Sequence, residues 1–156
     1  MTAKRLLQNF VKTKIIIVLV SSFVLFGGCL SFGEDVETTE PSPGHISKCR
    51  RLMYLRDDLE FQGEGYKITH GIDVAVWFKF STAETSASEI FIDSIVDIWR
   101  FEDSFNLYPH QDIKWWDVKN KYLYGGVVEL PQTKFMSVGM DRNPRGTTVY
   151  IFWHEI

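Results

Sequence analysis

The feature that most constrains the fold is an alternation of apolar and polar residues along residues 66–80. Even-numbered positions are nearly all apolar and odd-numbered ones mostly polar: Tyr66, Ile68, His70, Ile72, Val74, Val76, Phe78 and Phe80, against Lys67, Thr69, Gly71, Asp73, Ala75, Trp77 and Lys79. Successive side chains of a β-strand point to opposite faces, so this period of two predicts a strand with one face on a core. The pair His70-Gly71 marks either a bulge or the true start of the strand.

The last third of the chain predicts three more strands, at residues 126–130, 135–141 and 147–155. Between the last two, residues 142–146 (RNPRG) supply the turn residues of a hairpin. Both faces of the final strand are apolar, because Val149, Ile151 and Trp153 alternate with Tyr150 and Phe152. We therefore expect this strand to lie in the centre of a sheet rather than at its edge.

Helical signals are fewer. Ser86 and Glu89 have capping-box spacing before an apolar run, which predicts a helix over about residues 87–94. The β-branched residues that follow leave a strand as the alternative. Leu52, Leu55 and Leu59 suggest a short helix or turn. The predicted fold class is α+β: one small domain with an antiparallel sheet of about four strands and one or two helices on one face.

The first 28 residues have the three parts of a secretory signal: a basic start, an apolar stretch and a small-residue exit. The apolar stretch, residues 15–26, is twelve residues long and would span roughly 18 Å as a helix. Because a bilayer's hydrocarbon core is about 30 Å thick, a cleaved signal is favoured over a signal anchor that stays in place.

The segment Leu25-Phe26-Gly27-Gly28-Cys29 resembles the lipobox of bacterial lipoproteins. The resemblance implies that the thiol of Cys29 receives a diacylglycerol, that cleavage precedes it, and that its new amine is acylated. Leu30, where an aspartate would favour inner-membrane retention, then implies the outer membrane in bacteria with two membranes. Two or three acyl chains hold a protein stably at a membrane. The alternative is a chance cysteine, which would leave a Cys29–Cys49 disulfide possible.

Residues 29–48 combine four acidic residues with Ser, Thr, Pro and Gly, a composition typical of a flexible tether. The domain boundaries we expect are residues 1–28 for the signal, 29–48 for the lipidated cysteine and tether, and 49–156 for the globular domain. All four basic residues of the signal are lost with it, which leaves 13 basic and 20 acidic residues, a net charge of −7. That charge disfavours nucleic acid. Cys49 is expected to be a free thiol, with an intermolecular disulfide or metal binding as alternatives.

Trp115-Trp116-Asp117 is the most unusual local cluster. On a regular strand or helix the two indoles would diverge, so one buried and one lid-like tryptophan is the simpler interpretation. The alternative is an aromatic platform for a glycan or peptide, with Asp117 accepting a hydrogen bond.

A second hypothesis concerns His70 and Asp73 on the first strand together with His154 and Glu155 at the chain end. These are plausible zinc ligands if their strands are neighbours, although no HExxH spacing is present. Structural histidines are the simpler interpretation. No P-loop, GxGxxG, CxxC or GxSxG motif occurs, so no cofactor is expected and a non-enzymatic role is favoured.

Residues 70–156 are similar to small bacterial proteins of no known activity, several of them lipoproteins, in four segments: 115–118 (WWDV), 125–131 (GGVVELP), 135–139 (FMSVG) and 149–155 (VYIFWHE). The likeness supports a fold and implies no chemistry. We expect a membrane-anchored envelope lipoprotein that acts as a binding or accessory module, with an envelope protein or a glycan as partner. The alternatives are a small metal-dependent envelope hydrolase and an inhibitor or immunity-type lipoprotein.

Overall fold

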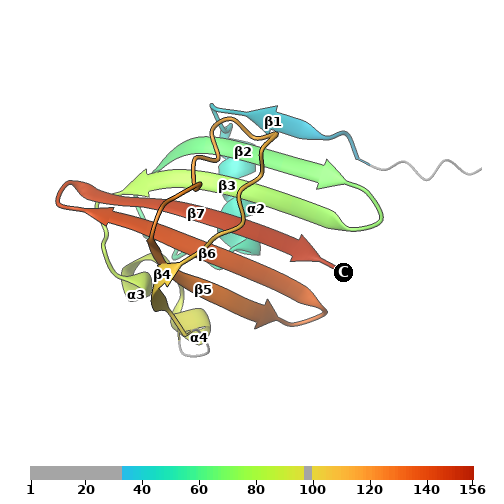
Figure 1. The fold of residues 1–156 in the computed structure, drawn as a ribbon. Helices are drawn as coiled ribbons and strands as arrows, with labels where there is room; N and C mark the ends of the chain where they lie inside the picture. The colour runs from blue at the N-terminus through green and yellow to red at the C-terminus, as the bar shows by residue number, and fades with distance from the viewer. Residues whose placement is uncertain (1–32, 97–99) are drawn as a thin grey trace, which may run out of the picture. The chain divides into compact units, whose positions relative to one another are not determined.

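One seven-stranded antiparallel sheet organises the part of the chain that the computed structural model describes, residues 33–96 and 100–156 (Figure 1). The strand order is β1-β2-β3-β7-β6-β5-β4. The strands are β1 (Val36–Thr38), β2 (Gln62–His70), β3 (Val74–Thr82), β4 (Glu102–Phe105), β5 (Leu123–Leu130), β6 (Lys134–Asn143) and β7 (Gly146–Glu155). The predicted α+β class with a single antiparallel sheet is confirmed, whereas the predicted number of about four strands is wrong.

β7 lies in the middle of the sheet, between β3 and β6. It pairs with β3 from Ala75↔His154 to Thr82↔Thr147, and with β6 over the whole length of both strands. The apolar residues on both of its faces are explained by this position, because a central strand is covered on each side.

The alternating segment 66–80 is two strands rather than one. β2 ends at His70 and β3 begins at Val74, and these two residues pair with each other across a hairpin of Gly71, Ile72 and Asp73. From Gly65↔Lys79 to His70↔Val74, even-numbered residues pair with even-numbered ones and odd with odd. The alternation therefore keeps the same phase on both sides of the turn. A period of two therefore fits the hairpin as well as it fits one long strand.

The helices are α2 (Pro43–Leu52), α3 (Ala87–Ile90) and α4 (Asp93–Val96). α2 begins inside the segment predicted to be a tether. Ser42 Oγ accepts a hydrogen bond from the His45 backbone N–H, and His45 Nδ1 accepts one from the Ser42 N–H, both at 3.3 Å. Pro43 occupies the first helical position, where its missing N–H costs nothing. Together with β1, this helix starts the folded region before the expected residue 49.

The predicted capping box of Ser86 and Glu89 is present, but its helix is four residues long. It stops because Phe91 takes an extended conformation and forms an isolated bridge with Leu55. α4 then forms a separate turn. The expected helix over 87–94 is thus interrupted in its middle.

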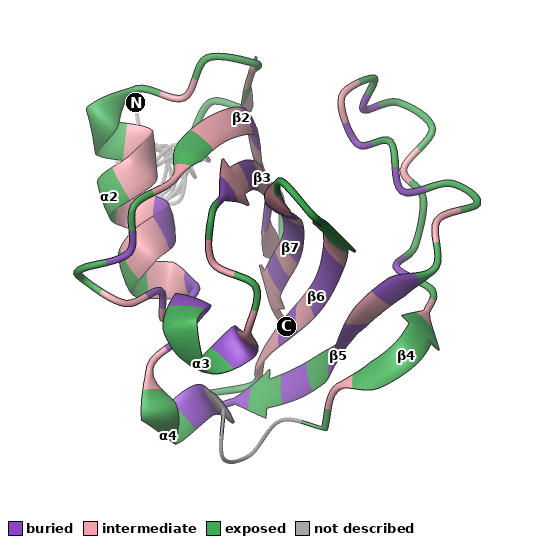
Figure 2. Ribbon diagram, turned by 90° about the vertical axis from the view of Figure 1, so that its left-hand side faces the viewer, coloured by how far each residue is buried: buried purple, intermediate pink, exposed green. Residues whose placement is uncertain are grey.

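The three helices cover one face of the sheet (Figure 2). Side chains of α2, α3 and α4 pack there against alternate residues of the strands, including Tyr66, Val76, Phe78, Phe80, Met136, Val138, Val149, Ile151 and Trp153. We call this the helix face. Among the described residues, no helix is long and apolar enough to cross a membrane.

The opposite face carries no helix in the described part of the chain. Residues 106–122, which connect β4 to β5, cross it instead (Figures 1 and 2). A second apolar cluster forms between this connection and the sheet, from Trp77, Leu107, Ile113, Trp116, Val118, Leu123 and Tyr150. We call this side the loop face.

Candidate functional site

Trp116 fastens the connection to the loop face. Its side chain is 3% exposed, and its ring meets the Tyr150 ring edge-on, with 5.5 Å between centroids. Its indole N–H donates to the Tyr108 carbonyl oxygen at 3.1 Å, so the polar end of the side chain is satisfied. Trp116 is therefore part of the apolar core on this face and offers no surface to a ligand.

The Trp115 ring stands edge-on to the Trp116 ring, with 5.9 Å between centroids. The half-buried Trp115 ring lies over Gly65 of β2, where an added Cβ would come within 2.3 Å of it. A side chain at position 65 would therefore push the ring off the strand. The two indoles therefore do not combine into an exposed platform.

Asp117 belongs to a network of ion pairs and hydrogen bonds. Its carboxylate accepts from Lys79 Nζ at 2.9 Å, from Lys121 Nζ at 3.0 Å and from the Tyr150 hydroxyl at 3.0 Å. Lys121 also reaches Asp141 at 3.1 Å and donates to the Tyr150 hydroxyl at 2.7 Å. The network joins the connection to β3, β6 and β7, so we name it the polar clamp: Lys79, Asp117, Lys121, Asp141 and Tyr150.

The electrostatics of the polar clamp follow from these contacts. Burial alone would raise the pKa of Asp117, but the hydrogen bonds from Lys79, Lys121 and Tyr150 hold it well below its ordinary value. Burial alone would lower the pKa of Lys121, and its bonds to Tyr150, Asp117 and Asp141 raise it instead. Both groups stay charged across the physiological range. Asp117 therefore has a structural role, because its carboxylate oxygens already accept hydrogen bonds from Lys79, Lys121 and Tyr150.

The hypothetical zinc ligands are not brought together. Alternation along β2 places His70 on the side of Ile68, the helix face, whereas His154 lies with Phe152 on the loop face. Asp73 is exposed in the β2–β3 turn. Within residues 33–96 and 100–156, no three His, Cys, Asp or Glu side chains gather as metal ligands would. This constellation therefore has no geometry for metal-dependent hydrolysis.

Cys49 is a free thiol with no exposed surface. Burial raises its pKa far above the ordinary thiol value, which keeps it protonated. A protonated thiol in the core is neither a metal ligand nor a nucleophile. Cys29, the predicted lipidation site, lies outside the described residues.

A row of stacked aromatic rings crosses the loop face beside the connection. Phe135 of β6 stacks on His154 of β7 with 5.4 Å between centroids, and His154 stacks on Phe152 at 5.0 Å. Phe152 stacks in turn on Trp77 of β3 at 4.9 Å. His110 of the connection then meets Trp77 edge-on at 4.8 Å. With Tyr108, which packs on His110, we call these six residues the aromatic ladder: Phe135, His154, Phe152, Trp77, His110 and Tyr108.

Much of the aromatic ladder is open to solvent. Phe135, Phe152, His154 and His110 are half-buried, and Tyr108 is 72% exposed. Val127 of β5, in the same cross-strand row as Phe152, is 56% exposed and extends the apolar surface. Burial is the main cause that lowers the pKa of His110, aided by the charge of Lys67, so this ring is neutral at neutral pH. The surface is therefore largely apolar across several strands, with the exposed Glu129 of β5 paired beside Phe135 at its edge.

Two ring nitrogens in the aromatic ladder lack a hydrogen-bond partner among the described residues: Trp77 Nε1 and His154 Nδ1. A buried polar atom without a partner costs on the order of 1–3 kcal/mol. Native cores contain few such atoms, but His70 Nδ1 on the helix face is another, so they do not by themselves distinguish the two faces.

The sequence contains a signal for the aromatic ladder that is visible only in retrospect. Trp77 is an aromatic residue at one of the mostly polar, odd-numbered positions of the alternating segment. Phe152 and His154 of the last strand lie on the same face of the sheet as those positions. Those positions meet only because β3 and β7 are neighbours. Sequence reasoning recognised the two apolar faces of the last strand but not the surface that they build.

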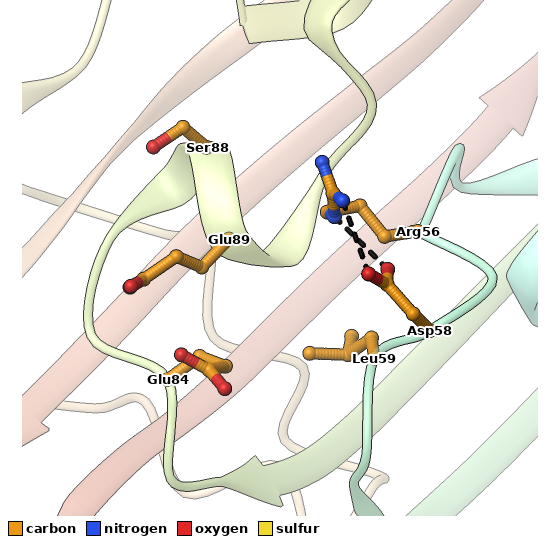
Figure 3. Close-up of a pocket in the computed structure, with 6 residues that line it drawn as sticks. All are labelled: Arg56, Asp58, Leu59, Glu84, Ser88 and Glu89. Atoms are coloured by element: carbon orange, nitrogen blue, oxygen red, sulfur yellow. Dashed lines mark hydrogen bonds and ion pairs between the residues drawn. The ribbon is translucent and has the colours of Figure 1, made fainter.

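A shallow hollow lies on another side of the domain, lined by Arg56, Asp58, Leu59, Glu84, Ser88 and Glu89 (Figure 3). The Arg56 guanidinium pairs with both carboxylate oxygens of Asp58, at 3.0 and 3.1 Å. Glu89 is engaged at the start of α3, where it accepts from the Ser86 hydroxyl and backbone N–H. Three charged side chains of this hollow, Arg56, Asp58 and Glu89, are thus already paired, which argues against a ligand site.

No family model, no curated protein and no solved structure matches this chain.

Proposed function

We propose that this chain is a bacterial envelope lipoprotein, anchored through Cys29, whose loop face binds a partner protein. The order of residues 1–29, with a basic start, a short apolar stretch and Gly-Gly-Cys, supports the anchor. The domain would then lie outside the cytoplasm, on the outer membrane in bacteria that have two membranes. The role is that of a binding or accessory module rather than an enzyme.

The observation that carries the binding role is the half-exposed aromatic ladder, together with Val127 and Tyr108, on the face that no described helix covers. Aromatic side chains are enriched in protein interfaces and are frequent among the residues that contribute most to binding. A contiguous apolar patch rimmed by polar residues is typical of an interaction site.

Ring orientation favours a protein over a glycan. Sugars stack on open aromatic faces, but His154 has one face against Phe135 and the other side against Phe152, and Phe152 also stacks on Trp77. These ring faces are occupied by neighbouring rings, which leaves the ring edges for contacts with a partner. Ring edges carry partial positive charge and suit carbonyl oxygens and apolar side chains, both of which a protein partner supplies.

Photo-crosslinking in the producing bacterium tests the binding surface, with two tyrosines as a matched pair. Tyr108, at 72% exposure, lies in the aromatic ladder, and Tyr122, at 82% exposure, lies on the same connection beside Asp103 and Asp141. We expect benzoyl-phenylalanine at position 108 to give one discrete cross-linked protein that position 122 does not give.

A single added charge sharpens this test. Val127→Glu should abolish the product formed at position 108, because the carboxylate would stand beside the aromatic ladder. If positions 108 and 122 give the same products, or if position 108 gives none, the loop face is not the binding surface.

The anchor has its own test, the intact mass of protein purified from bacterial membranes. We expect a species that begins at Cys29 with added acyl mass, and we expect Cys29→Ser to lose both the cleavage and the acyl mass. Protein that retains Met1 and no lipid would contradict the proposed anchoring.

A further inference from the structure

One end of the sheet carries two bare apolar side chains. Ile72, in the turn between β2 and β3, is 99% exposed, and the last residue, Ile156, is 73% exposed. Because Ala75 pairs with His154, the start of β3 and the end of β7 lie at the same end of the sheet (Figure 1). Ile72 has the greatest exposure of the large apolar side chains in the described part of the chain.

The chain enters the fold at this same end. An added Cβ on Gly33 would come within 2.8 Å of the His70 ring, so the first described residue lies against the last residue of β2. Two residues later, the Asp35 carboxylate accepts a hydrogen bond from the His70 backbone N–H at 2.7 Å. The entry point is therefore held beside the turn that carries Ile72.

Chain length limits how far an anchor at Cys29 can be from this end. Cys29 and Gly33 are four positions apart in the sequence, with three residues between them. A fully extended chain gains at most about 3.6 Å per residue, so the two positions are no more than about 14 Å apart. The tether expected over residues 29–48 is therefore shortened from the domain side, because β1 already begins at Val36.

We propose that this end of the sheet rests on the bilayer and that Ile72 inserts into the headgroup region, an inference that rests on the proposed lipidation of Cys29. The anchor holds the turn near lipid at high effective concentration, so one apolar side chain is enough to fix the orientation. The β6–β7 turn, at the other end of the strands, then points away from the membrane.

Charge specifies the kind of lipid surface. Asp35, Asp73 and Glu155 lie at this end, against Lys134. This acidic surplus repels anionic headgroups. Zwitterionic lipid is therefore the surface that suits the turn.

The test places an environment-sensitive fluorophore at either end of the sheet in the full-length, lipidated protein. Ile72→Cys carries it in one sample, and Arg145→Cys, exposed in the β6–β7 turn, is the matched control. Cys49 is buried and is not labelled in the folded protein. Both samples are reconstituted into phosphatidylcholine vesicles that contain nitroxide-labelled lipid.

We expect several-fold stronger nitroxide quenching at position 72 than at position 145, and weaker quenching at position 72 when phosphatidylglycerol is added. Equal quenching at both positions, in protein whose intact mass includes the acyl chains, would overturn the lipid contact and leave the anchor intact. Absence of acyl mass would overturn both. As a label-free check, membrane reconstitution should slow backbone hydrogen exchange in the turn at residues 71–73, and unchanged exchange would contradict the contact.

Discussion

The two faces of the sheet are covered in different ways. The helix face is sealed by α2, α3 and α4 over a continuous apolar core. The loop face is covered by an irregular connection held by seven buried side chains and the polar clamp, and the aromatic ladder beside it stays half-exposed. The comparison fits the proposed function, in which the half-exposed part of the loop face is the surface that recognises a partner.

The largest expected effect comes from two phenylalanines on opposite faces of neighbouring strands. Phe78→Ala, on the helix face with no exposed surface, should lower the free energy of unfolding by about 3–5 kcal/mol. Phe152→Ala, half-buried on the loop face, should cost about half as much, because less area leaves water on folding. Chemical denaturation measures both. Equal losses of unfolding free energy in the two variants would contradict the claim that the helix face contributes more to stability than the aromatic ladder does.

Trp116→Ala should come next, at about 3 kcal/mol, the low end of the range for buried aromatic residues. The connection can relax around the missing ring, since no regular element constrains it over most of its length. Hydrogen exchange should accelerate over residues 106–121 while β3 and β7 remain protected. Uniform acceleration throughout the sheet would show that the two faces unfold as one unit.

Asp117→Asn probes the polar clamp, with an expected cost of about 1 kcal/mol at pH 7, because the carboxylate is half-exposed and screened by solvent. The folded pKa of Asp117 is lowered, so its contribution is present above the unfolded pKa of about 4 and is lost as the pH falls toward the folded value.

Denaturation between pH 6 and pH 2 therefore provides the measurement for the clamp. The wild type should lose stability over this range. Asp117→Asn should lose less, because the contribution from protonation of Asp117 is missing in the variant. Asp103→Asn, at an exposed residue with no ion pair in the described part of the chain, is the matched control and should follow the wild type. Parallel curves for all three proteins would contradict the clamp.

The smallest effect on stability is expected for Val127→Glu. The side chain is largely exposed on β5, so unfolding should change by no more than about 0.5 kcal/mol. The same change should abolish cross-linking at position 108. A variant that is destabilised by several times that amount would mean that Val127 supports the fold rather than recognition.

Sequence reasoning found the class of the fold but missed three of the seven described strands: β1, β4 and one strand of the β2–β3 hairpin. The omission in the hairpin has an identifiable reason. The apolar period of two runs through Gly71-Ile72-Asp73 without a change of parity, so a hairpin had the pattern of a single strand. Length offered a signal: fifteen residues at about 3.3 Å each would make an unusually long strand. The final strand was placed correctly at the centre, because residues on both of its faces are apolar.

The start of the domain and the proposed binding surface were harder to predict. α2 is a polar helix in a segment whose composition is typical of a tether, and its capping box uses His45 in place of the usual Glu or Gln. The aromatic ladder combines side chains from β3, β6, β7 and the connection, which no local pattern relates. Its position depends on strand order, and strand order depends on tertiary packing.

Oxidative footprinting of intact bacteria against the purified protein tests the central claim most directly. If the loop face holds a partner, Tyr108 and Phe135 should be oxidised several-fold more slowly in cells than in isolation, while Tyr122 should be unchanged. Equal oxidation of Tyr108 in cells and in isolation would contradict the claim that this face is the binding surface.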